Sequence, residues 1–280
     1  MASTINEIIR QATEQLTASS PSARLDAEVL LMHITGLART ALITRSHEHL
    51  SAENEARLHA LLTRRMRGEP VAYLTGRREF WSMELHITPD VLIPRPETEL
   101  LVEQALLCIP ENEAWAIADL GTGSGAIALA IARERPRCRI LATDLSPAAL
   151  AVARANARQL AITSVEFRSG AWLAPLNGEM FDLIVSNPPY VAENDPHLTT
   201  GDLRFEPHTA LVSGTDGLDA IRRIAADARR CLKPGGWLLL EHGSDQRAAV
   251  RELLIVHGYR SIRQHADLAG LDRVTVCSMA

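Results

Sequence analysis

The first seventy residues carry apolar side chains at helical spacing. Ile5, Ile8, Ile9, Ala12 and Leu16 recur every three or four positions, which places them on one face of a helix. A second apolar face follows the Pro-Ser pair at 21–22, and the glycine at position 36 is suited to end it. So short a segment has too small a core for chemistry of its own, so we predict a small helical domain. The predicted helices cover about residues 5–16, 23–34 and 52–66.

Residues 78–93 follow the pattern of strands. Met83, Leu85 and Ile87 alternate with polar residues, as in a strand with one buried face. We predict that this strand pairs with residues 91–93 across a turn at 88–90, giving a hairpin linker. Three residues, Pro-Arg-Pro at 94–96, end the hairpin, and residues 96–99 open a helix with acidic side chains in its first turn.

From position 115 onward, short apolar runs alternate with helical segments, which is typical of a doubly wound parallel sheet. Ser146-Pro147 is a strong helix start, with an N-cap residue followed by proline at the first helical position. We therefore predict an α/β fold with a Rossmann-like, seven-stranded sheet. The predicted parts are a helical domain at 1–72, a hairpin linker at 73–95 and the α/β domain at 96–280. Strands are expected at 116–120, 139–143, 165–168, 181–186, 237–241, 259–264 and 273–277, and helices at 126–134, 147–160 and 218–232.

Composition narrows the function classes. The chain has 280 residues, of which 46% are hydrophobic and 22% charged, as in ordinary globular proteins. The net charge of −5 argues against a general nucleic-acid binder, which usually carries a basic excess. The four cysteines lack the spacing of a metal or redox site, so we expect no metal. Without a secretory signal or a long apolar stretch, we expect a cytoplasmic protein that binds no membrane.

The most informative segment is the tetrapeptide Asn187-Pro188-Pro189-Tyr190. It follows the apolar run 181–186, which we interpret as a buried parallel strand, and ligands bind at the carboxyl ends of such strands. Two prolines cannot continue a central strand and fix the backbone of a rigid turn. The Asn187 side-chain oxygen and the Pro188 carbonyl can accept both hydrogens of a planar NH2 group, and Tyr190 can pack on its plane. The irregular stretch that follows, 191–216, is long enough to be functional or disordered.

A glycine-rich turn follows the first strand of the predicted sheet. Gly121, Gly123 and Gly125 allow a sharp backbone turn and the close approach of a ligand. Asp144 ends the second strand, where a carboxylate can accept hydrogen bonds from ribose hydroxyl groups. The turn alone fits both a nicotinamide dinucleotide and S-adenosylmethionine. The tetrapeptide favours the second, because a nicotinamide enzyme has no use for a clamp on an NH2 group.

Three segments together resemble class I S-adenosylmethionine-dependent methyltransferases that act on amino groups: the glycine-rich turn with Asp119 before it, the tetrapeptide, and Leu-Lys-Pro-Gly-Gly at 232–236. The chain is still more similar to the protein-glutamine N-methyltransferases that modify peptide chain release factors, and this resemblance covers essentially the whole chain. The segments that carry the closer likeness are Arg64-Arg65, Gly68-Glu69-Pro70, Gly76, Arg78-Glu79-Phe80-Trp81, residues 92–99 (Leu-Ile-Pro-Arg-Pro-Glu-Thr-Glu) and Arg204-Phe205-Glu206-Pro207.

The resemblance implies roles for particular residues. Asp144 would hold the ribose, Trp172 would lie near the adenine, and Asn187 would contact both the cofactor and the target amide. The family usually has an acidic residue before this tryptophan, whereas this chain has Ser169-Gly170-Ala171, so an acidic contact to the adenine is in doubt here. The residues that would surround the methionine part of the cofactor are Gly121, Thr122, Gly123, Ser124 and Gly125.

The implied reaction moves a methyl group from S-adenosylmethionine to the side-chain nitrogen of a glutamine. The implied substrate is a class I peptide chain release factor, methylated in its Gly-Gly-Gln motif, and no direct contact with nucleic acid is expected. Positioning by Asn187 and Pro188 is the expected source of catalysis, with Tyr190 beside the amide and the sulfonium. No general base is assigned, because the amide proton becomes acidic once the methyl is attached.

Partner binding is expected from the helical domain and the hairpin. Arg64, Arg65 and Arg67 either contribute to that surface or form a solvated helix face. Arg95 and Glu97 either take part in the site or form an ion pair at the start of a helix.

Other functions remain open from the sequence. A methyltransferase for a ribosomal-protein glutamine would share every catalytic motif. An enzyme for the exocyclic amine of adenine or guanine would share the tetrapeptide, but it would need a positive surface and a pocket for a flipped base. A cofactor-binding module without activity would not need the tetrapeptide, and a nicotinamide oxidoreductase is the most distant alternative.

Overall fold

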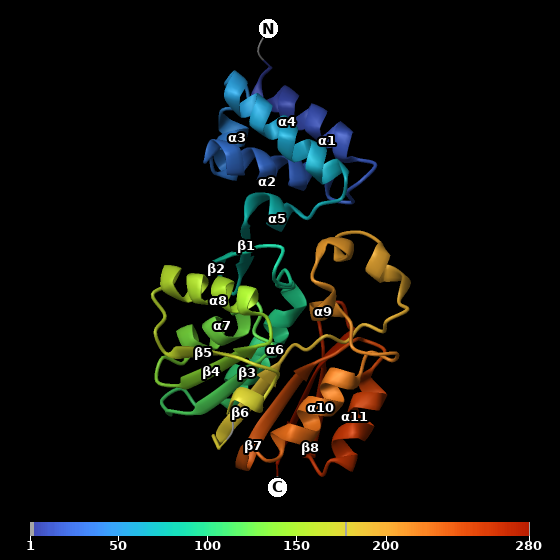
Figure 1. Cartoon of the computed structure of the whole chain (residues 1–280). Helices are drawn as coiled ribbons and strands as arrows, with labels where there is room; N and C mark the ends of the chain where they lie inside the picture. The colour runs from blue at the N-terminus through green and yellow to red at the C-terminus, as the bar shows by residue number, and fades with distance from the viewer. Residues whose placement is uncertain (1–2, 177, 280) are drawn as a thin grey trace. The chain divides into compact units, whose positions relative to one another are not determined.

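The computed structural model describes residues 3–176 and 178–279 and contains two compact units (Figure 1). The first comprises residues up to Arg77 together with His197–Phe205, and the second comprises Arg78–Pro196 and Glu206 onward. The chain thus leaves the second unit at Pro196 and returns to it at Glu206. In the described residues, no helix is long and apolar enough to cross a membrane.

The first unit is a bundle of short helices. Its core comes from the apolar stripes of α1 (Ile5–Leu16), α2 (Ala23–Thr35) and α4 (Ala52–Met66), and these three helices confirm the predicted ones. The N-terminus of α1 is held by a capping box, in which Thr4 and Glu7 bond each other's backbone N–H groups. Gly36 ends α2 in the left-handed conformation, as predicted. The sequence pattern missed two helices that are shorter than two turns, α3 (Arg39–Thr44) and α5 (Val71–Thr75).

A buried arginine binds the returning segment 197–205 within this unit. Arg65 is 5% exposed, and its Nε donates to Asp26 Oδ2 at 2.7 Å. Its Nη1 donates to Asp202 Oδ1 at 3.0 Å, across 137 positions of sequence. Arg204 donates to the backbone carbonyl of Arg67. The prediction that Arg65 lies on a solvated or partner-binding face is therefore wrong, because its side chain is buried and its charge is compensated by buried Asp26 and by Asp202 at the surface.

The hairpin prediction was wrong in its pairing. Strand β2 (Met83–His86) pairs with β1 (Arg77–Phe80) before it, not with residues 91–93 after it. The tight turn between the strands places Trp81 and Ser82 at φ values of +53° and +51°, which residues other than glycine seldom adopt. In the described structure residues 91–93 are not part of a strand, and Val91 and Ile93 are buried in irregular structure. The alternating apolar residues indicated correctly that this segment is buried, but such a pattern does not specify which strand pairs with which.

The second unit is built on a seven-stranded sheet of order β5-β4-β3-β6-β7-β9-β8. Neighbouring strands from β5 to β7 run parallel, and β9 is antiparallel to both of its neighbours. The predicted Rossmann-like α/β fold is confirmed. Only β7 differs clearly from its predicted range, because it starts five residues earlier, at the Leu-Lys-Pro-Gly-Gly segment. The strands are β3 (Ala116–Leu120), β4 (Arg139–Asp144), β5 (Val165–Ser169), β6 (Phe181–Ser186), β7 (Leu232–Glu241), β8 (Arg260–Ala266) and β9 (Asp272–Ser278).

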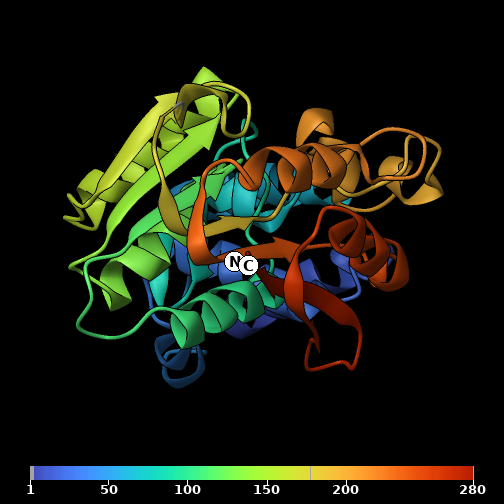
Figure 2. The same cartoon turned by 90° about the horizontal axis from the view of Figure 1, so that it is seen from below.

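Helices cover both faces of this sheet (Figure 2). The first group contains α6 (Glu99–Cys108), α7 (Ala126–Glu134) and α8 (Pro147–Gln159), which starts at the Ser146 cap as predicted. The other face carries α10 (Asp219–Ala228) and α11 (Arg247–Val256), whose apolar residues pack on Leu120, Ile184 and Leu240. Helix α10 is shorter than predicted, and α11 was not predicted. Short helical turns complete the chain: η1 (Pro96–Thr98), η2 (Ala174–Leu176), η3 (Pro196–Thr199), η4 (Leu203–Phe205) and α9 (His208–Leu211).

Backbone hydrogen bonds join the two ends of the long stretch after β6. Val191 N–H donates to the Leu211 carbonyl at 2.9 Å, and Ser213 N–H donates to the Val191 carbonyl at the same distance. A further backbone bond joins Glu193 N–H to the Gly214 carbonyl at 3.0 Å. The stretch is therefore a long loop whose two ends are held together, and η3, η4 and α9 lie within it.

Candidate active site

Two turns lie side by side at the carboxyl edge of the sheet. The glycine-rich turn follows β3 and the tetrapeptide follows β6, and these strands are direct parallel neighbours in which Leu120 is opposite Ser186. Ser186 Oγ donates to the Leu120 carbonyl at 2.6 Å and ties the two strand ends together. The structure thus brings together the two motifs that lie 66 positions apart in this register.

The glycine-rich turn depends on backbone conformations that suit glycine. Gly121, Gly123 and Gly125 have φ values of +73°, +55° and +85°. A Cβ on Gly121 would lie 3.1 Å from the ring of Trp172, whereas a Cβ on Gly123 would meet no atom within 4 Å. The turn is therefore closely packed behind Gly121 and open in front of Gly123. Such a turn leaves room for a ligand at the backbone of Gly123.

A buried carboxyl group supports this turn from below. Asp119 is fully buried, and Thr122 Oγ1 donates to its Oδ2 at 2.6 Å. Its Oδ1 has no hydrogen-bond partner among the described residues. Burial raises the pKa of Asp119 to about 7, against the opposing effect of the Thr122 hydrogen bond. The sequence analysis included Asp119 in the glycine-rich segment but gave it no role. Its position near the end of the buried strand β3 could have indicated a buried carboxyl group.

Asp144 lies at the edge of the same turn. Its Oδ2 accepts from Gly123 N–H at 2.9 Å, and its Oδ1 accepts from Ser146 N–H at 2.8 Å. The carboxylate is half-buried and fixed by two backbone donors. Each carboxylate oxygen has further acceptor capacity for a hydroxyl group. The predicted contact with a ribose stays a prediction, and the position of the group is compatible with it.

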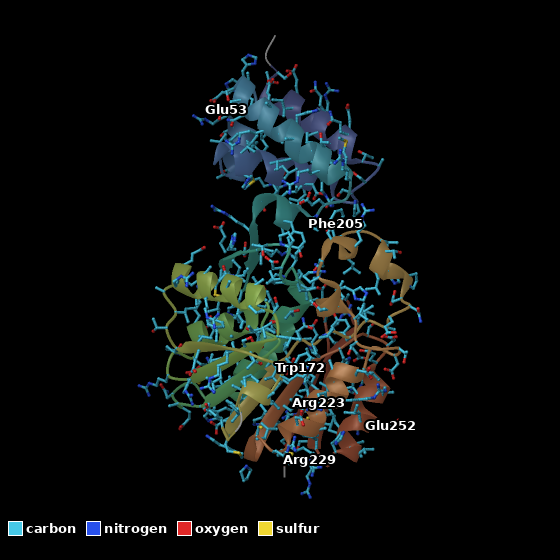
Figure 3. All side chains as sticks on the ribbon, in the orientation of Figure 1. Glu53, Trp172, Phe205, Arg223, Arg229 and Glu252 are labelled. Carbon is cyan, nitrogen blue, oxygen red and sulfur yellow. The ribbon has the colours of Figure 1, made fainter. Side chains whose placement is uncertain are left out.

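Trp172, labelled in Figure 3, lies beside Gly121 of the glycine-rich turn. Its φ is +51°, and its backbone carbonyl accepts from Thr143 Oγ1 at 2.8 Å, a bond that holds the residue at the end of β4. The indole is half-buried. It packs against the hydrophobic core of the second unit and lies beside Gly121. Its contact with an adenine stays a prediction.

The tetrapeptide presents its groups through contacts with other elements. Asn187 Nδ2 donates to Thr98 Oγ1 at 3.2 Å, and the Tyr190 hydroxyl donates to Glu241 Oε1 at 3.3 Å. The Tyr190 carbonyl accepts from Gln246 Nε2 at 2.9 Å. Pro188 is buried, whereas Asn187, Pro189 and Tyr190 are half-buried. The turn is thus anchored at both ends, and its first side chain lies at the edge of the site.

Sequence reasoning missed Thr98 and Glu241. Thr98 is 4% exposed at the start of α6, and Glu241 is 1% exposed at the end of β7. Burial raises the pKa of Glu241 to about 7, although hydrogen bonds from Thr98 and Tyr190 and the charge of Arg273 act to lower it. A charged residue closing an apolar central strand was the signal for Glu241.

A fully buried amide joins the hairpin to the glycine-rich turn. Asn156 on α8 accepts from His86 N–H at 2.7 Å and donates to the His86 carbonyl at 3.0 Å. The same Nδ2 donates to the Ser124 carbonyl at 2.9 Å. Its three hydrogen bonds satisfy the buried amide and fix the start of α7. Sequence reasoning gave Asn156 no role, because it lies within an ordinary helical pattern.

Two of the segments that carry the family resemblance meet in an ion pair. Arg95 donates to Glu206 Oε1, and the Glu206 side chain has no solvent exposure. Glu206 Oε2 accepts from Ile93 N–H at 3.1 Å. The alternative of an Arg95–Glu97 pair at the helix start is therefore wrong. Glu206 instead fixes the chain where it re-enters the second unit.

Within residues 3–176 and 178–279, no cluster of histidine, cysteine, aspartate or glutamate has the geometry of a metal site.

Comparison with known proteins assigns the family. Residues 7–76 match the family model described as PrmC N-terminal domain, and residues 97–206 match the one described as methyltransferase small domain. The release factor glutamine methyltransferase of Xylella fastidiosa (strain Temecula1) is 53% identical over 269 residues, with 96% of each chain covered. The chain belongs to the release factor glutamine methyltransferase family. The Escherichia coli (strain K12) member is 50% identical over 268 residues and again 96% of each chain is covered.

The fold of this family extends to more distant enzymes. The T. thermophilus 16S rRNA N2 G1207 methyltransferase, solved with AdoMet and guanosine, matches with a TM-score of 0.56 at 19% identity. The match covers 73% of this chain and 50% of that one. At this identity the likeness concerns the fold alone. Membership of the release factor glutamine methyltransferase family rests on the full-length relatives.

Proposed function

We propose that this protein transfers a methyl group from S-adenosylmethionine to the side-chain amide nitrogen of the glutamine in the Gly-Gly-Gln motif of a class I release factor. The observation that carries the proposal is the orientation of the Asn187 side-chain amide. Its nitrogen is engaged by Thr98, so its oxygen is left to accept a hydrogen bond at the edge of the site. A hydrogen-bond acceptor there suits the NH2 group of a glutamine.

The cofactor, when bound, supplies an electrophilic methyl group on a positively charged sulfur. The glutamine nitrogen forms the new bond to the methyl carbon, and the electrons of the carbon–sulfur bond stay on sulfur. Positive charge therefore moves from sulfur to nitrogen, and the nitrogen then loses a proton to solvent. Asn187 Oδ1 and the Pro188 carbonyl stabilise the charge that grows on nitrogen and hold its lone pair toward the methyl group.

The glycine-rich turn is proposed to hold the cofactor. Gly123 has open space in front of it, which suits the methionine part, with Thr122 and Ser124 flanking it. Asp144 is proposed to accept from the ribose hydroxyl groups and Trp172 to lie against the adenine. Ser169-Gly170-Ala171 offers no carboxylate, so the indole face would carry more of the adenine contact than in relatives that have one.

Partner docking is proposed for the helical part. The proposed functional division assigns residues 1–72 to substrate docking, 73–95 to a linker and 96–280 to methyl transfer. The excursion 197–205 packs with the helical unit, so it is a candidate for the same surface. Arg64 pairs with Glu69 and Arg65 is buried, which leaves Arg67 as the remaining arginine of that group for a partner. A cytoplasmic location, where translation occurs, stays a prediction from the sequence.

The alternatives that the sequence left open are not favoured. Relatives that match over 96% of the chain are named for a release factor, and none of these names refers to a ribosomal protein or a nucleobase. A ribosomal-protein target and an exocyclic amine of a base therefore serve as outcomes of the test.

The test is mass spectrometry of a purified class I release factor after incubation with this protein and S-adenosylmethionine. We expect one added methyl group, located on the Gly-Gly-Gln glutamine by fragmentation. A release factor whose glutamine is replaced by glutamate is the matched control and should gain none. Bound cofactor without methylation of the intact release factor would overturn the substrate assignment and direct the search to a ribosomal protein or a nucleobase.

A further inference from the structure

The orientation of the Asn187 amide is the starting point. An asparagine side chain has nearly the same shape after a half-turn that exchanges its oxygen and nitrogen. With the oxygen toward the substrate it accepts from an NH2 group, whereas with the nitrogen there it would repel that group. The proposed reaction therefore requires something in the protein that selects one of the two orientations.

We propose that Thr98 and Glu241 are positioning residues that select the orientation of the Asn187 amide in which its oxygen faces the substrate. This inference rests on the proposed function. The contact that selects the orientation is the hydrogen bond from Asn187 Nδ2 to Thr98 Oγ1 at 3.2 Å. In the described part of the chain no residue donates to Asn187 Oδ1, so that oxygen is available.

A hydroxyl group alone selects no orientation, because it can both donate and accept. The orientation of the Asn187 amide therefore depends on which acceptor takes the hydrogen of the Thr98 hydroxyl. The Thr98 hydroxyl also lies near the Glu241 carboxyl group, where it acts to lower the pKa of Glu241. An ionised carboxylate can only accept, so the hydrogen of Thr98 points to Glu241. The lone pairs of Thr98 Oγ1 then remain for Asn187 Nδ2.

Glu241 acts on the other end of the tetrapeptide as well. The Tyr190 hydroxyl donates to Glu241 Oε1 at 3.3 Å. The carboxylate therefore holds Tyr190 directly, and it lies near Thr98, which holds Asn187. Its Oε2 has no hydrogen-bond partner at ordinary distance among the described residues, so its acceptor capacity is not exhausted.

The position of Thr98 argues against a merely local role. It is the residue before α6, where a threonine often caps the helix with its side chain, yet it forms no such cap. It is also 4% exposed, so its hydroxyl is not there for solvent. Its hydroxyl instead accepts from Asn187, 89 positions away, and lies near Glu241, so that it stands between the ends of two parallel strands.

The test compares Thr98→Val with Thr98→Ser. Valine keeps the shape and removes the hydroxyl, and serine keeps the hydroxyl. We expect Thr98→Val to lower kcat for methylation of the release factor by ~10- to 100-fold, and Thr98→Ser to stay within ~3-fold of the parent. The affinity for S-adenosylmethionine, measured by calorimetry without turnover, should change by less than ~3-fold in both, because neither variant alters the glycine-rich turn.

Glu241→Gln provides the second arm. A glutamine can donate its NH2 to Thr98 Oγ1, which frees the threonine hydrogen for Asn187 Oδ1 and favours the wrong orientation. We expect a loss in kcat at least as large as for Thr98→Val. In the double variant the losses should not add, because both changes break one chain of hydrogen bonds. Thermal unfolding of each variant confirms that it is folded.

Each outcome decides the question. If the parent enzyme methylates the release factor and Thr98→Val does so at the parent kcat, the positioning role is overturned while the proposed function stands. Additive losses in the double variant overturn the connection between Glu241 and Thr98. If Thr98→Val does not fold, the Glu241→Gln kcat and cofactor affinity decide alone, and an unchanged kcat is fatal to the proposal. A parent enzyme that methylates no release factor overturns the proposed function instead.

Discussion

The two turns at the carboxyl edge of the sheet achieve order by opposite means. The turn at Gly121–Gly125 takes its shape from backbone conformations available to glycine, with support from β4, α7 and the side chains of Asn156 and Trp172. The turn at Asn187–Tyr190 has a backbone fixed by prolines, but its side chains depend on Thr98 and Glu241, which are distant in sequence. The first turn can be recognised from local spacing, whereas the second can be understood only from the fold.

The largest effect is expected from Asn187→Ala. It removes the acceptor for the glutamine NH2, and removal of one such group typically costs ~10²- to 10³-fold in kcat. Cofactor affinity should fall by much less, since the glycine-rich turn is intact. Steady-state rates combined with cofactor binding by calorimetry measure both. Near-normal turnover would contradict the role of the tetrapeptide.

The variants Gly121→Ala and Gly123→Ala test the glycine-rich turn. A Cβ on Gly121 would lie 3.1 Å from the Trp172 ring, so this variant should lose thermal stability in the absence of ligand. A Cβ on Gly123 meets no atom within 4 Å, and we expect a smaller loss of stability but a ~10-fold or greater loss of cofactor affinity. Melting temperature and cofactor dissociation constant are the two measurements. Equal effects of both variants on both quantities would show that the space at Gly123 is not the binding site.

The pH dependence of kcat should reveal the role of Glu241 beside the tetrapeptide. The pKa of Glu241 is raised to about 7 by burial, in surroundings that include Thr98, Tyr190, Arg273 and Glu97. Below that pH the carboxyl group is protonated and can donate, so we expect kcat to fall as the pH decreases through about 7. In Glu241→Gln this limb should vanish and leave a low, flat profile. Asp119 beneath the glycine-rich turn also has its pKa raised to about 7, so cofactor affinity is measured at each pH and kcat is compared at saturating cofactor. An identical kcat limb in Glu241→Gln would contradict the assignment.

The smallest effect on chemistry is expected from Gly68→Ala, which lies in the helical unit. Gly68 has φ +91°, and a Cβ there would overlap the Arg204 guanidinium. We expect a loss of about 1–2 kcal/mol in the free energy of unfolding from the strained backbone, and kcat within ~2-fold of the parent. Gly36→Ala, at φ +72° with no atom near its Cβ, is the matched control for backbone strain alone. A large fall in kcat at saturating substrate would show that this unit affects the chemical step.

Much of the fold follows from the sequence, since apolar periodicity locates buried strands and amphipathic helices well. Strands β3 and β6 and helices α4 and α7 match their predicted ranges. The hairpin was predicted with the wrong partner because residues 83, 85, 87, 91 and 93 are all buried, and burial does not specify pairing. Helix α11 was missed because its pattern lies between two stretches already interpreted as strands.

For the site, sequence spacing placed the glycine-rich turn and the tetrapeptide at one edge. It did not reveal the ion pair between Arg95 and Glu206 or the burial of Arg65, because both depend on partners more than a hundred positions away along the chain. Such contacts need the tertiary fold. The residues that would hold ligand directly were therefore easier to predict than the residues that orient them.

The return of residues 197–205 to the helical unit has a consequence for synthesis of the protein. The helices up to α5 leave the ribosome first, but Asp202, which compensates the buried charge of Arg65, is translated 137 positions after it. At ordinary rates of translation that delay is on the order of 10 s. During this interval Arg65 has only Asp26 as a carboxylate partner. The first unit to emerge is thus among the last to be completed, and it can reach its final packing only after β6 of the second unit has been made.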